Sequence, residues 1–171
     1  FTRDPMFLPS LRATFYYVVL SVPLKLAFAL AVAMLLNMQL GLINLYRTLL
    51  YLPSILGGSV AVSVLWRVLF MYDGVVNTIL GLVGIPAVKW LGDPNVSMIT
   101  ISLLQVWQFG SSMVVFLAGL KQIPKELYES ARVDGAGRIS EFLHITIPLL
   151  TPMILFNLIM QTINAFQHFT E

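Results

Sequence analysis

Glu126-Leu-Tyr-Glu-Ser-Ala-Arg-Val-Asp-Gly-Ala136, continuing to Ile145-Thr-Ile-Pro148, is a charged and glycine-bearing stretch between two long apolar segments. The composition of the whole chain explains why this stretch stands out. The 171 residues are 58% hydrophobic and only 11% charged, whereas a soluble globular domain has about 25% charged residues. This deficit of charge indicates an integral membrane protein, in which so polar a segment has to lie outside the hydrocarbon layer.

Within this stretch the sequence predicts two short helices. Pro124 suits the first turn of a helix because its missing N–H is not needed there, and residues 125–133 follow as the first helix. Asp134-Gly135 ends it, because glycine adopts the left-handed conformation that helix ends commonly require. A second short helix is expected from about Arg138 to Thr146, before Pro148 restarts the chain as a membrane helix.

Both short helices are predicted to be amphipathic. In the first, Leu127, Tyr128 and Ala131 share one face, and Glu129 and Arg132 are three residues apart, so they can pair on the surface. The inner face of the second helix is expected to comprise Ile139, Phe142, Leu143 and Thr146. Two such helices at an angle form a compact knob, which can transmit force to a neighbouring protein. The alternative is a polar connection at the membrane surface with no other role.

Outside this stretch, four segments are long enough to cross a membrane, which takes about 20 mostly apolar residues. They cover residues 11–36, 48–70, 96–120 and 148–166, with approximate ends. In the second, small residues recur four apart and would let another helix approach closely: Ser54/Gly58, Gly57/Ala61 and Ser59/Ser63. Residues 75–88 are apolar but short and broken by glycine and proline, which favours a short helix that lies at the membrane surface or packs on the bundle.

The predicted fold is therefore all-α: a polytopic transmembrane helix bundle, with residues 1–171 forming a single transmembrane domain. The chain starts at Phe1 without a methionine or a signal-peptide pattern and stops at Glu171 after an apolar stretch. We therefore expect further helices before residue 1 and after residue 171. There is no cysteine for a disulfide, we expect no metal site, and no basic cluster is present to bind nucleic acid.

The spacing Glu129-x-Ala131, Asp134-Gly135-Ala136 and Ile145-x-Ile147-Pro148 resembles the EAA motif of permease subunits of binding-protein-dependent ABC importers. Ser130 stands where that motif usually has alanine, and Ile147 where it often has leucine. Four further stretches extend the likeness, which is greatest to the carbohydrate-uptake branch of maltose and multiple-sugar type: Tyr46–Pro53, Trp90–Pro94, Phe116–Glu129 and Phe166–Glu171.

The resemblance implies a type I ABC importer fold in which the 121–148 loop is the cytoplasmic surface on which ATPase subunits dock. It implies a coupling role for Glu126, Glu129, Ala131, Asp134, Gly135, Ala136, Ile145 and Pro148. It also implies that the chain lies in the lipid bilayer of the plasma membrane and has three protein partners: cytoplasmic ATPase subunits, a second and related permease, and an extracytoplasmic sugar-binding protein. With the loop inside, the positive-inside bias has the right direction but is weak.

The sequence itself contains no site for an energy-yielding reaction. A Gly-x-x-x-x-Gly-Lys-Ser/Thr loop, which cradles nucleotide phosphates, is absent, and so is a His-Glu-x-x-His zinc motif. We therefore expect no catalytic residue and no cofactor in this chain. ATP and magnesium would be bound by the partner ATPase.

Amide side chains recur at helical spacing in two of the apolar segments. Gln105 and Gln108 share a face of the third segment, and Asn157, Gln161 and Asn164 share a face of the fourth, which His168 continues. Amides offer donors and acceptors to sugar hydroxyls, and polar groups at membrane depth often mark a transport pathway. The alternative is that they bond across helices and hold the bundle together. Lys25 is the lone intramembrane charge, and we expect it to snorkel or to meet a partner rather than to bind substrate.

Three other functions stay open at this point. The EAA motif is shared with amino-acid and peptide permeases, which are the alternative importers. An ion-coupled secondary transporter would place acidic groups or broken helices near the membrane midplane. Pro23 and Gly57-Gly58 favour such breaks, but every Asp and Glu lies outside the four apolar segments. A scaffold without a substrate is disfavoured by the polar helix faces.

Overall fold

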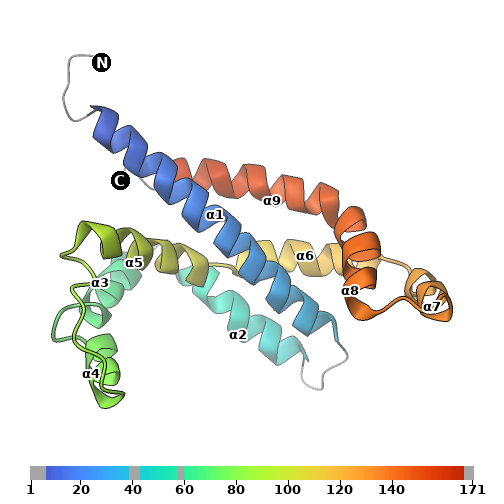
Figure 1. The fold of residues 1–171 in the computed structure, drawn as a ribbon, viewed down its shortest axis with the longest axis horizontal. Helices are drawn as coiled ribbons and strands as arrows, with labels where there is room; N and C mark the ends of the chain where they lie inside the picture. Colours follow the sequence, from blue (N-terminus) through green and yellow to red (C-terminus); the bar gives the residue numbers. More distant parts are fainter. Residues whose placement is uncertain (1–6, 39–42, 58–59, 168–171) are drawn as a thin grey trace.

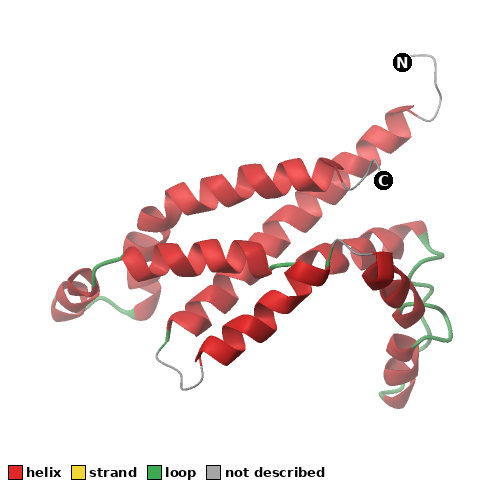
Figure 2. Cartoon of the chain, turned by 180° about the vertical axis from the view of Figure 1, so that it is seen from behind, coloured by secondary structure: helices red, strands yellow, loops and turns green. Residues whose placement is uncertain are grey.

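A computed structural model describes residues 7–38, 43–57 and 60–167 (Figure 1). Within these ranges every regular element is helical, as the sequence predicts (Figure 2). The elements are α1 (Phe7–Asn37), α2 (Ile43–Leu56), α3 (Val60–Leu69), α4 (Val75–Leu82), α5 (Pro94–Trp107), α6 (Gly110–Gln122), α7 (Lys125–Val133), α8 (Arg138–Glu141), the π-helical turn η1 (Phe142–Thr146) and α9 (Ile147–Gln167). Gly58, Ser59 and His168, and the end of the Phe166–Glu171 stretch, lie outside the described residues.

Helix α1 is the centre of the bundle. It packs against α6, α9 and α5, and more briefly against α2. Where it meets its neighbours, Ala29 and Ala33 are completely buried, and small residues of this kind let membrane helices approach closely. Gly119 of α6 has the same role in the contact between α6 and α9, because a Cβ atom there would lie 2.7 Å from Leu150 Cδ2 of α9. The core of the bundle is thus built around α1 by close packing of small residues.

Only two of the four predicted spans are continuous helices. Among the described residues, α1 and the run from Arg138 to Gln167 are long and apolar enough to cross a membrane alone. The expected second span is broken into α2 and α3, whose axes differ by 99°, and the expected third into α5 and α6, which differ by 49°. The expected spans over 48–70 and 96–120 are therefore bent pairs of helices rather than single continuous helices. The chain has up to four spans if each bent pair counts as one.

The two breaks lie side by side and satisfy each other's backbone. The Gln108 side chain, at the second break, donates from Nε2 to the Gly57 carbonyl at the first, over 3.0 Å. In return, the Ser111 backbone N–H donates to Ser54 Oγ over 3.3 Å. Gly110 is needed at this contact, because a Cβ there would come within 3.0 Å of Tyr51 Cα. A backbone group freed by a helix break is costly in a membrane unless it is bonded, and each break here supplies the bond the other needs.

The bundle has two distinct ends. Helices α7 and α8 lie at one end of the bundle, and α3 and α4 lie at the opposite end (Figure 1). The short helix expected within 75–88 is confirmed as α4 (75–82). It ends at Gly84, which has a φ of 79°. Four hydrogen bonds to the buried Asn77 side chain hold this segment; they involve the backbone of Tyr72 and Val88 and the Trp90 indole.

The expected second short helix does not stand alone. Residues 138–141 start as α8, widen into the π-helical turn η1 and continue as α9, so that Pro148 lies inside a run of 30 residues. A proline normally breaks a helix because its ring crowds the preceding turn and it has no N–H. The wider turn before Pro148, in which the Ile147 N–H bonds to the Phe142 carbonyl, relieves that crowding. The polar stretch therefore contains one separate helix, α7.

Candidate functional site

Helix α7 ends in a Schellman motif centred on Gly135. The Gly135 N–H donates to the Arg132 carbonyl over 3.0 Å, and the Ala136 N–H to the Ala131 carbonyl over 2.8 Å. Gly135 itself has a φ of 82°, in the left-handed region that favours glycine. The predicted helix 125–133 and its end at Asp134-Gly135 are thus confirmed, and the Asp-Gly-Ala spacing has a physical reason.

Two side-chain contacts tie α7 to the start of the long C-terminal helix. Arg132 donates from Nε and Nη2 to both carboxylate oxygens of Glu141, at 2.8 and 3.4 Å. Tyr128 Oη and Thr146 Oγ1 form a second hydrogen bond of 2.9 Å. The bond to Glu141 raises the pKa of Arg132 above its ordinary value, with a smaller contribution from Glu129. We call α7, η1 and the residues between them (125–146) the knob.

Arg132 therefore pairs with Glu141 rather than with Glu129, the partner that helical spacing allows. Glu141 lies across the turn, and its side chain is only 9% exposed, so that it competes for the guanidinium from a less hydrated site. Bidentate geometry favours this partner further. Glu129 is left exposed on the outer side of α7, where it can meet another protein.

The predicted coupling residues divide into an outer and an inner group. The outer group is exposed: Glu126, Glu129, Asp134, Gly135 and Pro148. The inner group is half-buried: Ala131, Ala136 and Ile145. Two exposed apolar residues were missed as surface groups, Val133 (88% exposed) and Ile139 (78%). The expectation that Ile139 and Leu143 line an inner face is wrong, since both side chains point outward, whereas Phe142 and Thr146 do pack inward.

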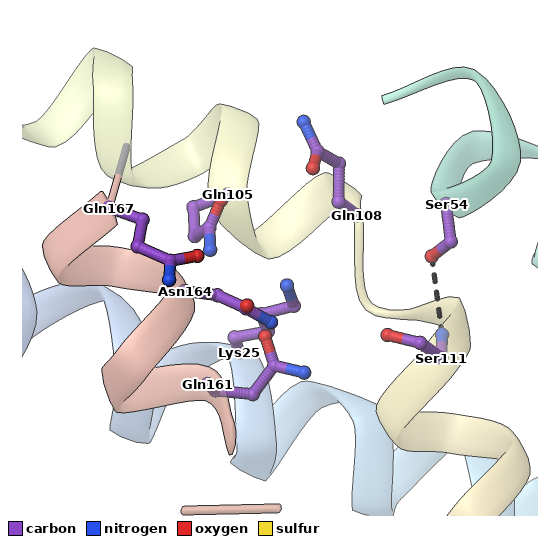
Figure 3. A pocket seen from close by; sticks show the side chains of 8 residues that line it. All are labelled: Lys25, Ser54, Gln105, Gln108, Ser111, Gln161, Asn164 and Gln167. Atoms are coloured by element: carbon purple, nitrogen blue, oxygen red, sulfur yellow. Dashed lines mark hydrogen bonds between the residues drawn. The ribbon is translucent and has the colours of Figure 1, made fainter. Parts of the chain in front are cut away.

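A polar cavity of about 270 Å³ lies among α1, α2, α5, α6 and α9, at the level of the two helix breaks (Figure 3). All eight side chains that line it are polar: Lys25, Ser54, Gln105, Gln108, Ser111, Gln161, Asn164 and Gln167. A cluster of amides inside an apolar bundle can offer donors and acceptors to the hydroxyl groups of a neutral or polar solute.

The structure brings together four of the five amides that the sequence singles out for a pathway. Gln105, Gln161 and Asn164 point into the cavity (Figure 3). Gln108 also lines it, but its amide points toward Gly57, so bracing of the helix breaks explains this residue. Asn157 is buried outside the cavity lining, and its Nδ2 donates to the Met153 carbonyl of its own helix.

Lys25 has a different position from the one expected. It is only 4% exposed, and its side chain points into the cavity rather than along α1 toward an end of the helix (Figure 3). It therefore does not snorkel. The sequence marked it only as the lone intramembrane charge, because nothing in one helix indicates which of its faces meets a polar cavity.

Comparison with known proteins places these features in one family. Residues 10–171 match the family described as "Binding-protein-dependent transport system inner membrane component". The chain is 54% identical, over 99% of its length, to the probable ABC transporter permease protein YesP of Bacillus subtilis, of which it covers 55%. It is 38% identical, over 99% of its length, to the lactose transport system permease protein LacF of Rhizobium radiobacter, of which it covers 58%.

A solved structure agrees in fold. It is the crystal structure of a bacterial alginate ABC transporter in complex with an alginate pentasaccharide-bound periplasmic protein. A chain of that complex matches with a TM-score of 0.80 and 27% identity, over 94% of the present chain and 57% of its own length. The present chain thus spans a little over half the length of the relatives it matches. With its apolar spans, its polar knob and this likeness, the chain belongs to the family of inner membrane components of binding-protein-dependent transport systems.

Proposed function

We propose that this chain is part of the membrane-spanning subunit of an ATP-driven importer that moves a sugar or oligosaccharide inward by alternating access. The observation that carries the proposal is that the same two helices adjoin the knob and line the cavity. Helices α6 and α9 flank the knob in the sequence, and both contribute side chains to the cavity. The named cargoes of two relatives, lactose and alginate, support a carbohydrate.

In the proposed mechanism, cytoplasmic ATPase subunits bind ATP and magnesium and dock on the knob. Their closure displaces α7, and the bonds from Arg132 to Glu141 and from Tyr128 to Thr146 pass this displacement to α9. A shift of α9 and α6 against α1 would change the side from which the cavity is open. The chain contributes no nucleotide site of its own and acts as a transport subunit rather than an enzyme.

The remaining partners follow from the two ends of the bundle. With the knob cytoplasmic, the α3–α4 end faces outward, where an extracytoplasmic sugar-binding protein would dock. A second, related permease would complete the pathway in the plasma membrane. An amino-acid or peptide permease and an ion-coupled transporter find no support in the relatives, and no carboxylate lies among the described residues that line the cavity.

The test is charge reversal on the outer face of α7 in the complete transporter. Because Glu129 is exposed and free to meet a basic group, Glu129→Lys is expected to lower co-purification of the ATPase and sugar uptake about tenfold, as for a lost charged contact. Asp73→Lys, an exposed reversal at the opposite end of the bundle, is the matched control and should keep the ATPase bound. Normal uptake together with normal ATPase stimulation in Glu129→Lys would refute the coupling role.

A further inference from the structure

We propose that Lys25 is a substrate-binding residue and that its ammonium group selects a saccharide bearing a carboxylate. The proposal rests on the proposed function, because it names the class of cargo for the same cavity. It assigns to this position a role that the amides alone cannot have. Amides bind neutral and acidic sugars alike, whereas an ammonium group distinguishes between them.

The position of Lys25 is the first support. It lies in the middle of α1, and residues on either side of it along the same face, Val22 and Ala29, are buried in the bundle. Figure 3 shows the Lys25 side chain pointing toward Gln161 and Asn164 of α9, with Gln105 of α5 facing the same space. The side chain is thus almost fully buried and points into the cavity, whereas a snorkelling lysine extends along its helix toward one end.

The charge balance of the cavity is the second support. Of the described residues that line it, one is basic and none is acidic. Among the described residues, the ion pair in the structure joins Arg132 to Glu141 in the knob. Within the same residues, Lys25 has neither an ion pair nor a hydrogen bond. A charged group inside a membrane protein is ordinarily paired. A bound anion would be the missing partner.

The groups beside Lys25 fit the rest of a sugar acid. Gln161 is 5% exposed, and its Oε1 is buried without a hydrogen-bond partner among the described residues. A buried acceptor without a hydrogen bond destabilises the protein, and a ligand that donates a hydrogen bond to it removes this penalty. A sugar hydroxyl is such a donor. Asn164 and Gln105 offer further donors and acceptors at the same wall. A uronate unit carries both the hydroxyls for these amides and the carboxylate for Lys25.

The experiment compares one disaccharide in two charge states. Complete transporters are reconstituted in proteoliposomes with the binding protein and supplied with a dihexuronate or with the same disaccharide reduced to its neutral alcohols. Uptake and stimulated ATPase activity are measured for the natural chain, Lys25→Gln, Lys25→Arg and Arg12→Gln. The last removes one exposed positive charge from the same helix and is the matched control.

The expected result is selective. Lys25→Gln should lower uptake of the dihexuronate about tenfold or more, as for loss of a hydrogen bond to a charged group, and leave uptake of the neutral disaccharide unchanged. Lys25→Arg should retain most of the acidic uptake, and Arg12→Gln should behave as the natural chain.

Two results would overturn the proposal while the importer function stands. One is uptake of only the neutral sugar by the natural chain. The other is an equal loss of both sugars in Lys25→Gln, or a loss of permease pairing on size exclusion, since Lys25 would then have a structural partner on another chain. Failure of every variant and of the natural chain to move either sugar would instead count against the proposed function.

Discussion

The knob and the cavity both gather polar side chains, but they satisfy them differently. In the knob, Arg132 is bonded to Glu141 and Tyr128 to Thr146, so that polar groups on two helices are fixed to one another. In the cavity, Lys25 has no ion pair or hydrogen bond among the described residues, and the Gln161 carbonyl oxygen is buried without a hydrogen-bond partner. Groups that bond to one another hold a segment rigid, whereas buried groups without a protein partner can bond to a ligand. On this difference we assign transmission of movement to the knob and binding of cargo to the cavity in the proposed importer.

The largest effect is expected where the cavity wall itself is built. Gly110→Val would put a branched side chain within 3.0 Å of the α2 backbone, and the helices would have to separate. Overpacking of this kind costs about 2 kcal/mol. The melting temperature of Gly110→Val in detergent should be clearly lower than that of the natural chain. Gly81→Ala, where a Cβ meets nothing within 4 Å, should not lower it. Equal melting temperatures would mean that α2 and α6 move apart at little cost, and would contradict a rigid contact between the two helix breaks.

A smaller loss is expected in the knob. Gly135→Ala forces a Cβ into a left-handed conformation, with a φ of 82°, and should destabilise the end of α7 by about 1 kcal/mol. Hydrogen exchange of the α7 amides should increase as the helix frays. The control is Gly137→Ala, whose Cβ also meets open space but whose φ of −81° suits any residue. If both variants exchange alike, the Schellman motif does not fix the knob.

The smallest effect on stability is expected inside the cavity. Gln161→Leu removes an acceptor that has no protein partner, so the free energy of unfolding should change by less than about 0.5 kcal/mol or rise slightly. Sugar uptake should nevertheless require about tenfold more substrate, because a ligand hydroxyl loses its partner. Asn157→Leu, which breaks a bond within α9 outside the cavity, is the matched control and should leave the KM for uptake unchanged. A large loss of stability in Gln161→Leu would contradict the division between knob and cavity.

Local signals in the sequence were enough to predict the knob helix and the gathering of the amides. Pro124 and Asp134-Gly135 determine the ends of α7 through their own backbone preferences. Gln161 and Asn164 share a face through helical spacing alone, and they meet Gln105 because α5 and α9 both pack on α1.

The features that escaped prediction depend on residues far apart in the chain. The sequence pointed to a break at Gly57-Gly58, but the partner that stabilises it, Gln108, lies 51 residues later, and an apolar run gives no sign of such a partner. Arg132 pairs with Glu141 rather than with Glu129 because the turn at Gly135 brings Glu141 next to the guanidinium group. The roles of Asn77 and of the π-helical turn likewise depend on tertiary contacts that helical periodicity does not encode.

The reciprocal hydrogen bonds between the two helix breaks have a mechanical consequence. Because Gln108 holds the carbonyl of one break and Ser54 holds an amide of the other, neither bent span can change its angle without stretching a bond to its neighbour. The two hydrogen bonds therefore couple the two breaks, so that a change of angle at one is expected to pull on the other. A tilt imposed on α6 from the knob would appear at the junction of α2 and α3, on the far side of the cavity.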